Sequence, residues 1–127
     1  MIPPESSDNA KAAEFFMTLL HAATSAHVLH LQARSYSQHE ALGGFYSDLP
    51  GLVDSVIESY QGRYGIISAY PGGYAVPMGE PLEFLSTVSD YVMESRGAVA
   101  ADSEIQNAID EIQALLNSTI YKLRFLA

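Results

Sequence analysis

Apolar residues recur along most of the chain at three- and four-residue steps, the spacing that places side chains on one face of an α-helix. Four segments carry this pattern: about Ser7 to Gln32, Gln38 to about Gln61, Pro81 to about Gly97, and Asp102 or Ser103 to the C-terminus. Helices of this length joined by short connections bury their apolar faces against one another. The pattern therefore predicts an all-α fold, a small four-helix bundle.

Each predicted helix has its own apolar stripe. The stripe of the first helix is Phe16, Leu19, Leu20, Ala23, His27, His30 and Leu31. That of the second is Leu42, Phe45, Leu49, Val53, Val56 and Tyr60. The third has Leu82, Leu85, Val88 and Val92, and the fourth has Ile105, Ile109, Ile112, Leu116, Ile120 and Leu123. Together these side chains form the predicted core.

Local signals place the ends of the second helix. Ser37 followed by Glu40 is a capping-box pattern, which predicts a helix beginning at Gln38. Pro50 lies in the interior of this helix, where a proline removes one hydrogen bond and costs roughly 3 kcal/mol unless the helix kinks. We therefore expect a bend at Pro50, with Asp48 able to cap a restart.

A long segment rich in Gly, Pro and Tyr separates the second and third predicted helices. It runs from residue 62 to residue 81 and has no sustained period (GRYGIISAYPGGYAVPMGEP). Loops of this length in compact domains are usually functional or interfacial, so a subunit contact is one expectation for it. Pro81 suits the first position of the helix that follows.

Composition limits the kinds of function. A chain of 127 residues with 48% hydrophobic residues is the size of one domain, which we expect to span residues 1–127. No long apolar run or signal-peptide pattern occurs, so we expect a cytoplasmic protein with no membrane contact. Six basic against fifteen acidic residues give a net charge of −9, which disfavours direct nucleic-acid binding. Because cysteine is absent, any metal site must use histidine and carboxylate ligands.

Four residues form a plausible ligand set for iron or zinc. His27 and His39 are twelve residues apart, and Asp54 and Glu58 follow four residues apart. Each also has an ordinary explanation. Carboxylates opposite a hydrophobic stripe usually form a solvated face, and histidines on a stripe are more often packed core residues.

Helix geometry decides how such a set could assemble. His39 and Asp54 are fifteen residues apart, which is about 22 Å along one continuous helix. Metal–ligand bonds of about 2 Å cannot bridge that gap, so one subunit cannot close the site unless the helix folds back at Pro50. Two antiparallel copies in a two-fold dimer can, because His27 and His39 of one would meet Asp54 and Glu58 of the other. Small residues on the acidic face would permit this close approach: Gly43, Ser47 and Gly51.

The same residues resemble a known family. The stretch HVLHLQARSYSQHEALGGFYSDLPGLVDSVIESYQGRYG resembles the region from helix A to helix B of the Dps miniferritins. Their ferroxidase signature spaces His, His, Asp, Asp and Glu by twelve, four, eleven and four residues, and His27, His39, Gly43, Asp54 and Glu58 have the same spacing. The C-terminal IDEIQALLNSTIYKLRFL resembles the last helix of that family, and the chain is also similar to short ferritin-like proteins of tailed phages.

The resemblance implies a ferritin-like four-helix bundle that binds iron between subunits of a dodecameric shell and oxidises it with peroxide or oxygen. His27 and His39 of one subunit and Asp54 and Glu58 of its partner would be the iron ligands. Gly43 departs from the pattern, since the family has a carboxylate there. Its absence implies one weaker metal position rather than a full di-iron centre. The basic tail with which family members hold DNA is absent.

Two hypotheses follow. The first is a homodimer, or a larger shell, with an intersubunit iron site and ferroxidase activity. The second is a non-catalytic helical dimer or interaction module, with a degenerate or structural zinc site and a Tyr-rich insert that contacts another protein. His30 could replace the missing ligand or act next to the ligands, although a packed, hydrogen-bonded role is the more ordinary expectation. No Glu-x-x-His pair, HExxH, GxxxxGK[ST] or GxSxG motif supports another chemistry.

Overall fold

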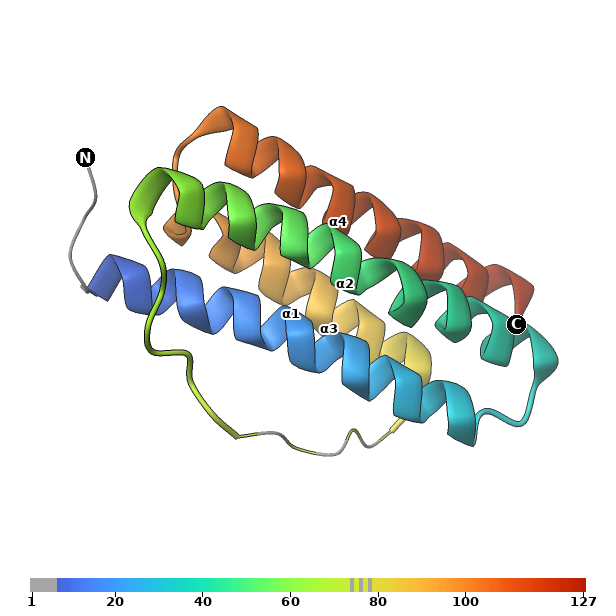
Figure 1. Cartoon of the computed structure of the whole chain (residues 1–127). Coiled ribbons are helices and arrows are strands. Elements are labelled where there is room, and N and C mark those ends of the chain that lie inside the picture. Colours follow the sequence, from blue (N-terminus) through green and yellow to red (C-terminus); the bar gives the residue numbers. More distant parts are fainter. Residues whose placement is uncertain (1–6, 74, 76, 78) are drawn as a thin grey trace.

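The described part of the chain folds into four α-helices that pack side by side around one core (Figure 1). The computed structural model describes residues 7–73, 75, 77 and 79–127. The helices are α1 (Ser7–Gln32), α2 (Tyr36–Tyr64), α3 (Pro81–Ser95) and α4 (Ser103–Tyr121). A short 3-10 turn, η1 (Arg96–Ala98), follows α3, and a π-helical turn, η2 (Lys122–Leu126), follows α4. Among the described residues there is no β-strand, so the predicted all-α class is confirmed.

The helices form two antiparallel hairpins, α1 with α2 and α3 with α4. Short connections join the helices within each hairpin, whereas α2 ends and α3 begins at opposite ends of the bundle (Figure 1). Helix α1 therefore packs against α2 and α3, and α4 packs against the same two helices. Four-helix bundles with a single long crossover belong to a distinct topological class, separate from those with short loops throughout.

The predicted apolar stripes of α2, α3 and α4 form the core. Every predicted residue of the α2 stripe is buried, including Phe45 and Leu49. Ile105, Ile109 and Ile112 of α4 are fully buried. Burial of this apolar surface stabilises the bundle by roughly 1.5–3 kcal/mol for each large side chain.

The predicted stripe of α1 is wrong in its last two turns. Leu31 is 70% exposed, and His27 is exposed as well. The buried positions there are Ala22, Ala26 and Leu29, which continue the face begun by Phe15 and Phe16 at three- and four-residue steps. One residue of a helix turns its side chain by about 100°, so a stripe displaced by one position leaves the core.

Helix α2 begins two residues earlier than the capping pattern predicted. The hydroxyl of Ser35, not that of Ser37, accepts the backbone N–H of Gln38, at 3.2 Å. The hydroxyl oxygens of Ser35 and Ser37 lie 2.9 Å apart, so the second serine supports the cap instead of forming it. The first helical residue is therefore Tyr36.

Pro50 does not interrupt α2. The helix is continuous from Tyr36 to Tyr64, so the expected restart at Asp48 does not occur. Pro50 is exposed, while the neighbouring Leu49 and Val53 are fully buried. Packing of these neighbours outweighs the hydrogen bond that the proline removes.

The C-terminal end of α2 is tied to the segments that follow it. The amide oxygen of Gln61 accepts the backbone N–H of Ile67 at 2.9 Å, and Ile67 is buried. Gly65 ends the helix at a φ of 99°, a conformation that favours glycine. The described residues from 65 to 80 form neither helix nor strand, and residues 74, 76 and 78 of the predicted loop lie outside the described part. Pro81 is the first residue of α3, as predicted.

The N-terminal end of α4 is held by side chains of other elements. Asp102 is its N-cap residue, but the carboxylate accepts a hydrogen bond from the Tyr64 hydroxyl and pairs with Arg63 at 3.3 Å. Arg96 donates to Gln106 at 2.9 Å and contacts Asp110 at 2.6 Å. These contacts connect the ends of α2, α3 and α4. Within the described chain, none of the helices has the length and apolar character needed to cross a lipid bilayer.

Candidate functional site

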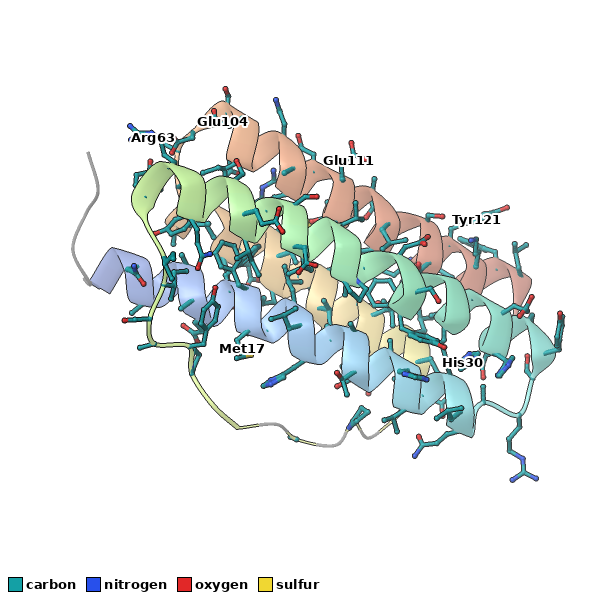
Figure 2. The ribbon with its side chains drawn as sticks, in the orientation of Figure 1. Met17, His30, Arg63, Glu104, Glu111 and Tyr121 are labelled. Carbon is teal, nitrogen blue, oxygen red and sulfur yellow. The ribbon has the colours of Figure 1, made fainter. Side chains whose placement is uncertain are left out.

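Two histidines hold the end of α1 to the start of α2. Nδ1 of His30 lies 2.7 Å from the backbone carbonyl oxygen of His39, and Nδ1 of His39 lies 2.9 Å from that of His30. The two imidazole rings stack, with centroids 3.7 Å apart and an interplanar angle of 21°. His30 is therefore packed and hydrogen-bonded, as the more ordinary of its two expectations predicted. Figure 2 labels it near the C-terminal end of α1.

The hydrogen bonds fix where the protons of these rings lie. A carbonyl oxygen can only accept a hydrogen bond, so Nδ1 must be the donor in both His30 and His39. In the neutral form of each ring, Nε2 then has an unprotonated lone pair. Metal-bound histidines in proteins commonly show this arrangement, with one ring nitrogen donating to a carbonyl and the other available to the metal. His39 is thus chemically suited to act as a ligand.

His27 lies beside this pair. Its ring stacks on Tyr46 of α2, with centroids 3.9 Å apart and an interplanar angle of 7°. The centroids of His27 and His30 are 6.2 Å apart. Tyr46 also contacts the ring of His30, with centroids 5.2 Å apart, so four rings form one surface cluster over α1 and α2. We call His27, His30, His39 and Tyr46 the imidazole cluster.

Gly43 lies under the imidazole cluster. A Cβ atom at this position would be 3.0 Å from Cε1 and 3.2 Å from Nδ1 of His30. A Cβ at position 43 would therefore be in tight contact with the imidazole of His30, and the ring would have to shift by a few tenths of an ångström. This contact gives a structural reason for the glycine at position 43.

The two acidic candidates lie elsewhere on α2. Asp54 and Glu58 are both exposed, in agreement with their predicted position away from the core. Because α2 is continuous, His39 and Asp54 are separated by about 22 Å along its axis. In one chain, His27 and His39 both lie beside the His30 ring, with centroids 6.2 and 3.7 Å from it, and the acids lie farther along α2. Across residues 7–73, 75, 77 and 79–127, no three His, Asp or Glu side chains gather in a way that could hold a metal ion.

Comparison with known proteins gives a family. Residues 30–123, three quarters of the chain, match a family model described as "Family of unknown function (DUF5856)". The chain belongs to DUF5856. The matched residues of DUF5856 begin at His30 and include His39, Asp54 and Glu58, whereas His27 lies outside them.

A phage protein is also similar to the chain. It is the "Uncharacterized 14.6 kDa protein in mobD-ri intergenic region" of Enterobacteria phage T4. The two are 26% identical over 121 residues, which cover 94% of this chain and 92% of the phage protein. The similarity thus extends over nearly the full length of both proteins. No solved structure matches the chain.

The sequence pattern does not identify two of the contacts in the imidazole cluster. It gives Tyr46 no role, and it does not pair His30 with His39. One signal is available, since both histidines lie within four residues of the predicted connection between two antiparallel helices. The pairing itself cannot be read from spacing, because it depends on how α2 is rotated against α1.

Proposed function

We propose that this DUF5856 protein is a ferritin-like homodimer that binds ferrous iron between its two copies and oxidises it. The observation that carries the proposal is the orientation of His39. Its Nδ1 donates to a main-chain carbonyl, which leaves the lone pair of Nε2 for a metal ion. The single long crossover between α2 and α3 supports the ferritin-like class, in which one such connection is characteristic.

The two-copy arrangement follows from the length of α2. A continuous helix separates His39 from Asp54 by about 22 Å, so both can contact one ion only if they come from different chains. In a two-fold dimer with antiparallel α2 helices, His27 and His39 of one copy meet Asp54 and Glu58 of the other. Symmetry produces two equivalent sites. The exposed Gly44 and Gly51, which have open space around them, leave room for a close approach of the two helices.

The donor set fits one iron ion per site. Two neutral imidazole nitrogens and two carboxylates suit Fe²⁺, and the carboxylates also stabilise the ferric product. Space for a carboxylate at position 43 is taken by His30, which favours one ion over a di-iron centre. Iron is the substrate in this proposal. Each Fe²⁺ gives up one electron, so two Fe²⁺ and two protons convert one hydrogen peroxide into two waters and leave two Fe³⁺.

Anaerobic ferrous titration followed by addition of peroxide tests the proposal. Wild-type protein is expected to bind about one Fe²⁺ per chain and to develop ferric absorbance quickly after peroxide. His39→Asn, which retains a donor near the position of Nδ1 but lacks Nε2, should lose this binding, and so should Glu58→Ala. Asp48→Asn is the matched control, because Asp48 is an exposed acid of α2 outside the proposed ligand set.

Mixing the two inactive variants tests whether the site is shared. After subunit exchange at equal concentration, about half of the dimers are mixed, and each mixed dimer has one intact site. About a quarter of the wild-type capacity should therefore return. Capacity that stays at the level of the single variants would show that the ligands do not come from two copies.

A second candidate function is a non-catalytic helical dimer with a structural zinc site. The replacement of a carboxylate position by the His30 ring favours it, because loss of an anionic ligand weakens binding of hard ferrous and ferric ions most. The same titrations separate the two functions. Stoichiometric zinc binding with no ferric absorbance would support the structural site and exclude the ferroxidase.

A further inference from the structure

His30 has the geometry of a residue that holds His39 in place, not that of a second ligand to the same ion. A metal ion lies in the plane of the imidazole that binds it, about 2.0–2.1 Å from the nitrogen. The rings of His30 and His39 are 3.7 Å apart and only 21° from parallel, so their planes do not converge within bonding distance. The two rings therefore cannot share one metal ion.

We propose that His30 is a positioning residue for His39, and this inference rests on the proposed role of His39 as a metal ligand. The side chain of His30 covers one face of the His39 ring. Its Nδ1–H also donates to the His39 carbonyl at 2.7 Å, which holds the backbone of His39 against α1. We call this reciprocal pair of hydrogen bonds, together with the ring stack, the histidine clasp.

The histidine clasp restricts a side chain that would otherwise rotate. His39 lies in the first turn of α2, next to the connection between the helices, and its ring is partly exposed. The clasp directs Nδ1 of His39 to the carbonyl of His30 in the last turn of α1, which also accepts the backbone N–H of Ala33 at 3.4 Å. Nε2, on the other edge of the ring, is thereby held in one direction. Ligands held in advance lose less freedom when an ion binds.

The absence of a side chain at Gly43 leaves space for the histidine clasp. The Cβ of any other residue at this position would lie 3.0 Å from Cε1 of His30, so the ring would have to shift by a few tenths of an ångström. The glycine is therefore part of the device that orients His39. In this interpretation, position 43 departs from the miniferritin spacing pattern. The chain loses one possible carboxylate ligand there and gains a better oriented His39.

The first test uses the metal-free protein and NMR. Long-range ¹H–¹⁵N correlation spectra of the imidazoles should show both His30 and His39 as Nδ1–H tautomers. His30→Ala keeps the carbonyl that accepts from His39 but removes the ring stack and the His30 Nδ1–H donor, so the His39 ring should leave that carbonyl part of the time and exchange between tautomers, while far-UV circular dichroism reports an unchanged helix content. An Nε2–H tautomer of His39 in the wild type, or a fixed Nδ1–H tautomer in His30→Ala, would overturn the proposal.

The second test measures Co²⁺ affinity from its visible absorption. His30→Ala should weaken Co²⁺ binding about tenfold, the size of effect that loss of a residue supporting a ligand produces. His30→Asn should recover much of the loss, because its amide nitrogen can take the place of Nδ1 as donor to the His39 carbonyl. His21→Ala is the matched control, since His21 lies on α1 in the groove toward α3.

Failure of the proposed function and failure of the positioning role give different results. If wild-type protein binds no Co²⁺ or Fe²⁺, the proposed function fails, and the tautomer spectra still decide whether the histidine clasp orients His39. If metal binds normally and His30→Ala has wild-type affinity and an unchanged absorption spectrum, the positioning role is wrong while the proposed function stands.

Discussion

Gly43 is explained by a single contact at the scale of one residue. In the spacing pattern, Gly43 stands where a carboxylate is expected. In the fold, it lies directly beneath the imidazole of His30. A Cβ added at the neighbouring Gly44 would meet no heavy atom within 4 Å. Of these two adjacent glycines, Gly44 has room for a side chain, whereas a side chain at Gly43 would meet His30.

This contrast predicts opposite effects of two alanine substitutions. Gly44→Ala should raise the free energy of unfolding by roughly 0.5–1 kcal/mol, because alanine is the better helix former. Gly43→Ala should lower it by about 1 kcal/mol, since displacing His30 loses a hydrogen bond and a ring contact that outweigh the same helical gain. Urea denaturation of the three proteins measures both values. Equal stabilisation by the two alanines would show that His30 yields without cost.

Tyr64 and Asp102 form a second residue-scale contact with a measurable pH dependence. The hydrogen bond from Tyr64, with Arg63 nearby, lowers the pKa of Asp102 below its usual value of 3.8. The same hydrogen bond raises the pKa of Tyr64 above 10.0. The bond therefore stabilises the fold while Asp102 is ionised and Tyr64 is protonated.

The stabilisation should disappear at both ends of the pH scale. A carboxylate with a lowered pKa stabilises the native state above pH 3.8, and this is lost as the pH falls through the lowered value. A tyrosine with a raised pKa stabilises it below pH 10.0, and this is lost as the pH rises through the raised value. The stability difference between wild type and Tyr64→Phe should be constant near neutral pH and shrink beyond both limits.

Thermal unfolding at a series of pH values tests this expectation. Tyr121→Phe is the control, because Tyr121 is the last residue of α4, at the end of the bundle opposite Arg63 and Glu104 (Figure 2). Its difference from wild type should not change at acid pH. A Tyr64→Phe difference that is just as flat would mean that the hydrogen bond to Asp102 contributes nothing to folding.

At the scale of elements, α2 shows how packing overrides a local signal. Pro50 is a local signal for an interruption, yet α2 is continuous from Tyr36 to Tyr64, with Leu49 and Val53 buried on its core face. Ser35 and Ser37 show a second limit of local signals. Both residues can cap a helix, and the sequence does not say which one will. Capping signals locate a helix start only to within a residue or two.

Replacing each of two prolines with alanine should show that a proline inside a helix lowers stability, whereas a proline at the start of a helix raises it. Pro50→Ala should stabilise the protein by roughly 1–3 kcal/mol, because it restores a helical hydrogen bond to the Tyr46 carbonyl and removes a clash. Pro81→Ala should destabilise it by about 0.5 kcal/mol, since proline fits the first turn of a helix and restricts the unfolded chain. Calorimetric melting temperatures report both. A destabilised Pro50→Ala protein would indicate that α2 needs the proline for its shape.

At the scale of the whole molecule, charge opposes the proposed dimer. Each chain has a net charge of −9, and the proposed interface includes the exposed acids Asp54 and Glu58. Repulsion between two such chains is screened by salt, with a screening length of about 10 Å at 0.1 M. A metal ion bound between the chains would neutralise part of this charge and favour the dimer.

Sedimentation equilibrium should therefore show a dimer that tightens with ionic strength. The dimer dissociation constant is expected to fall several-fold between about 0.02 and 0.2 M NaCl as charge repulsion is screened. The double variant Asp54→Asn, Glu58→Gln should bind itself more tightly at low salt and depend less on salt. Dissociation of the wild-type dimer by added salt would instead indicate an interface held by ion pairs, which contradicts the proposed arrangement.

The sequence predicted much of the fold and a smaller part of the site. Helix spacing identified the core residues of α2, α3 and α4, because their buried apolar positions recur on one face. It failed at the end of α1, where small alanines are buried and the larger Leu31 is exposed. Leu29 is buried there as well, so the error lies in the direction of the predicted stripe, since a shift of one residue turns a side chain by about 100°.

Spacing along the chain by itself determined the helices, most of the core and the separation of His39 from Asp54, because these depend on the fixed rise and turn of an α-helix. Only the tertiary structure decided that α2 stays continuous through Pro50, that His30 pairs with His39, and that Gly43 makes room for them. These features depend on the rotation of one helix against another. That rotation is set by the packing of many side chains, and no local pattern encodes it.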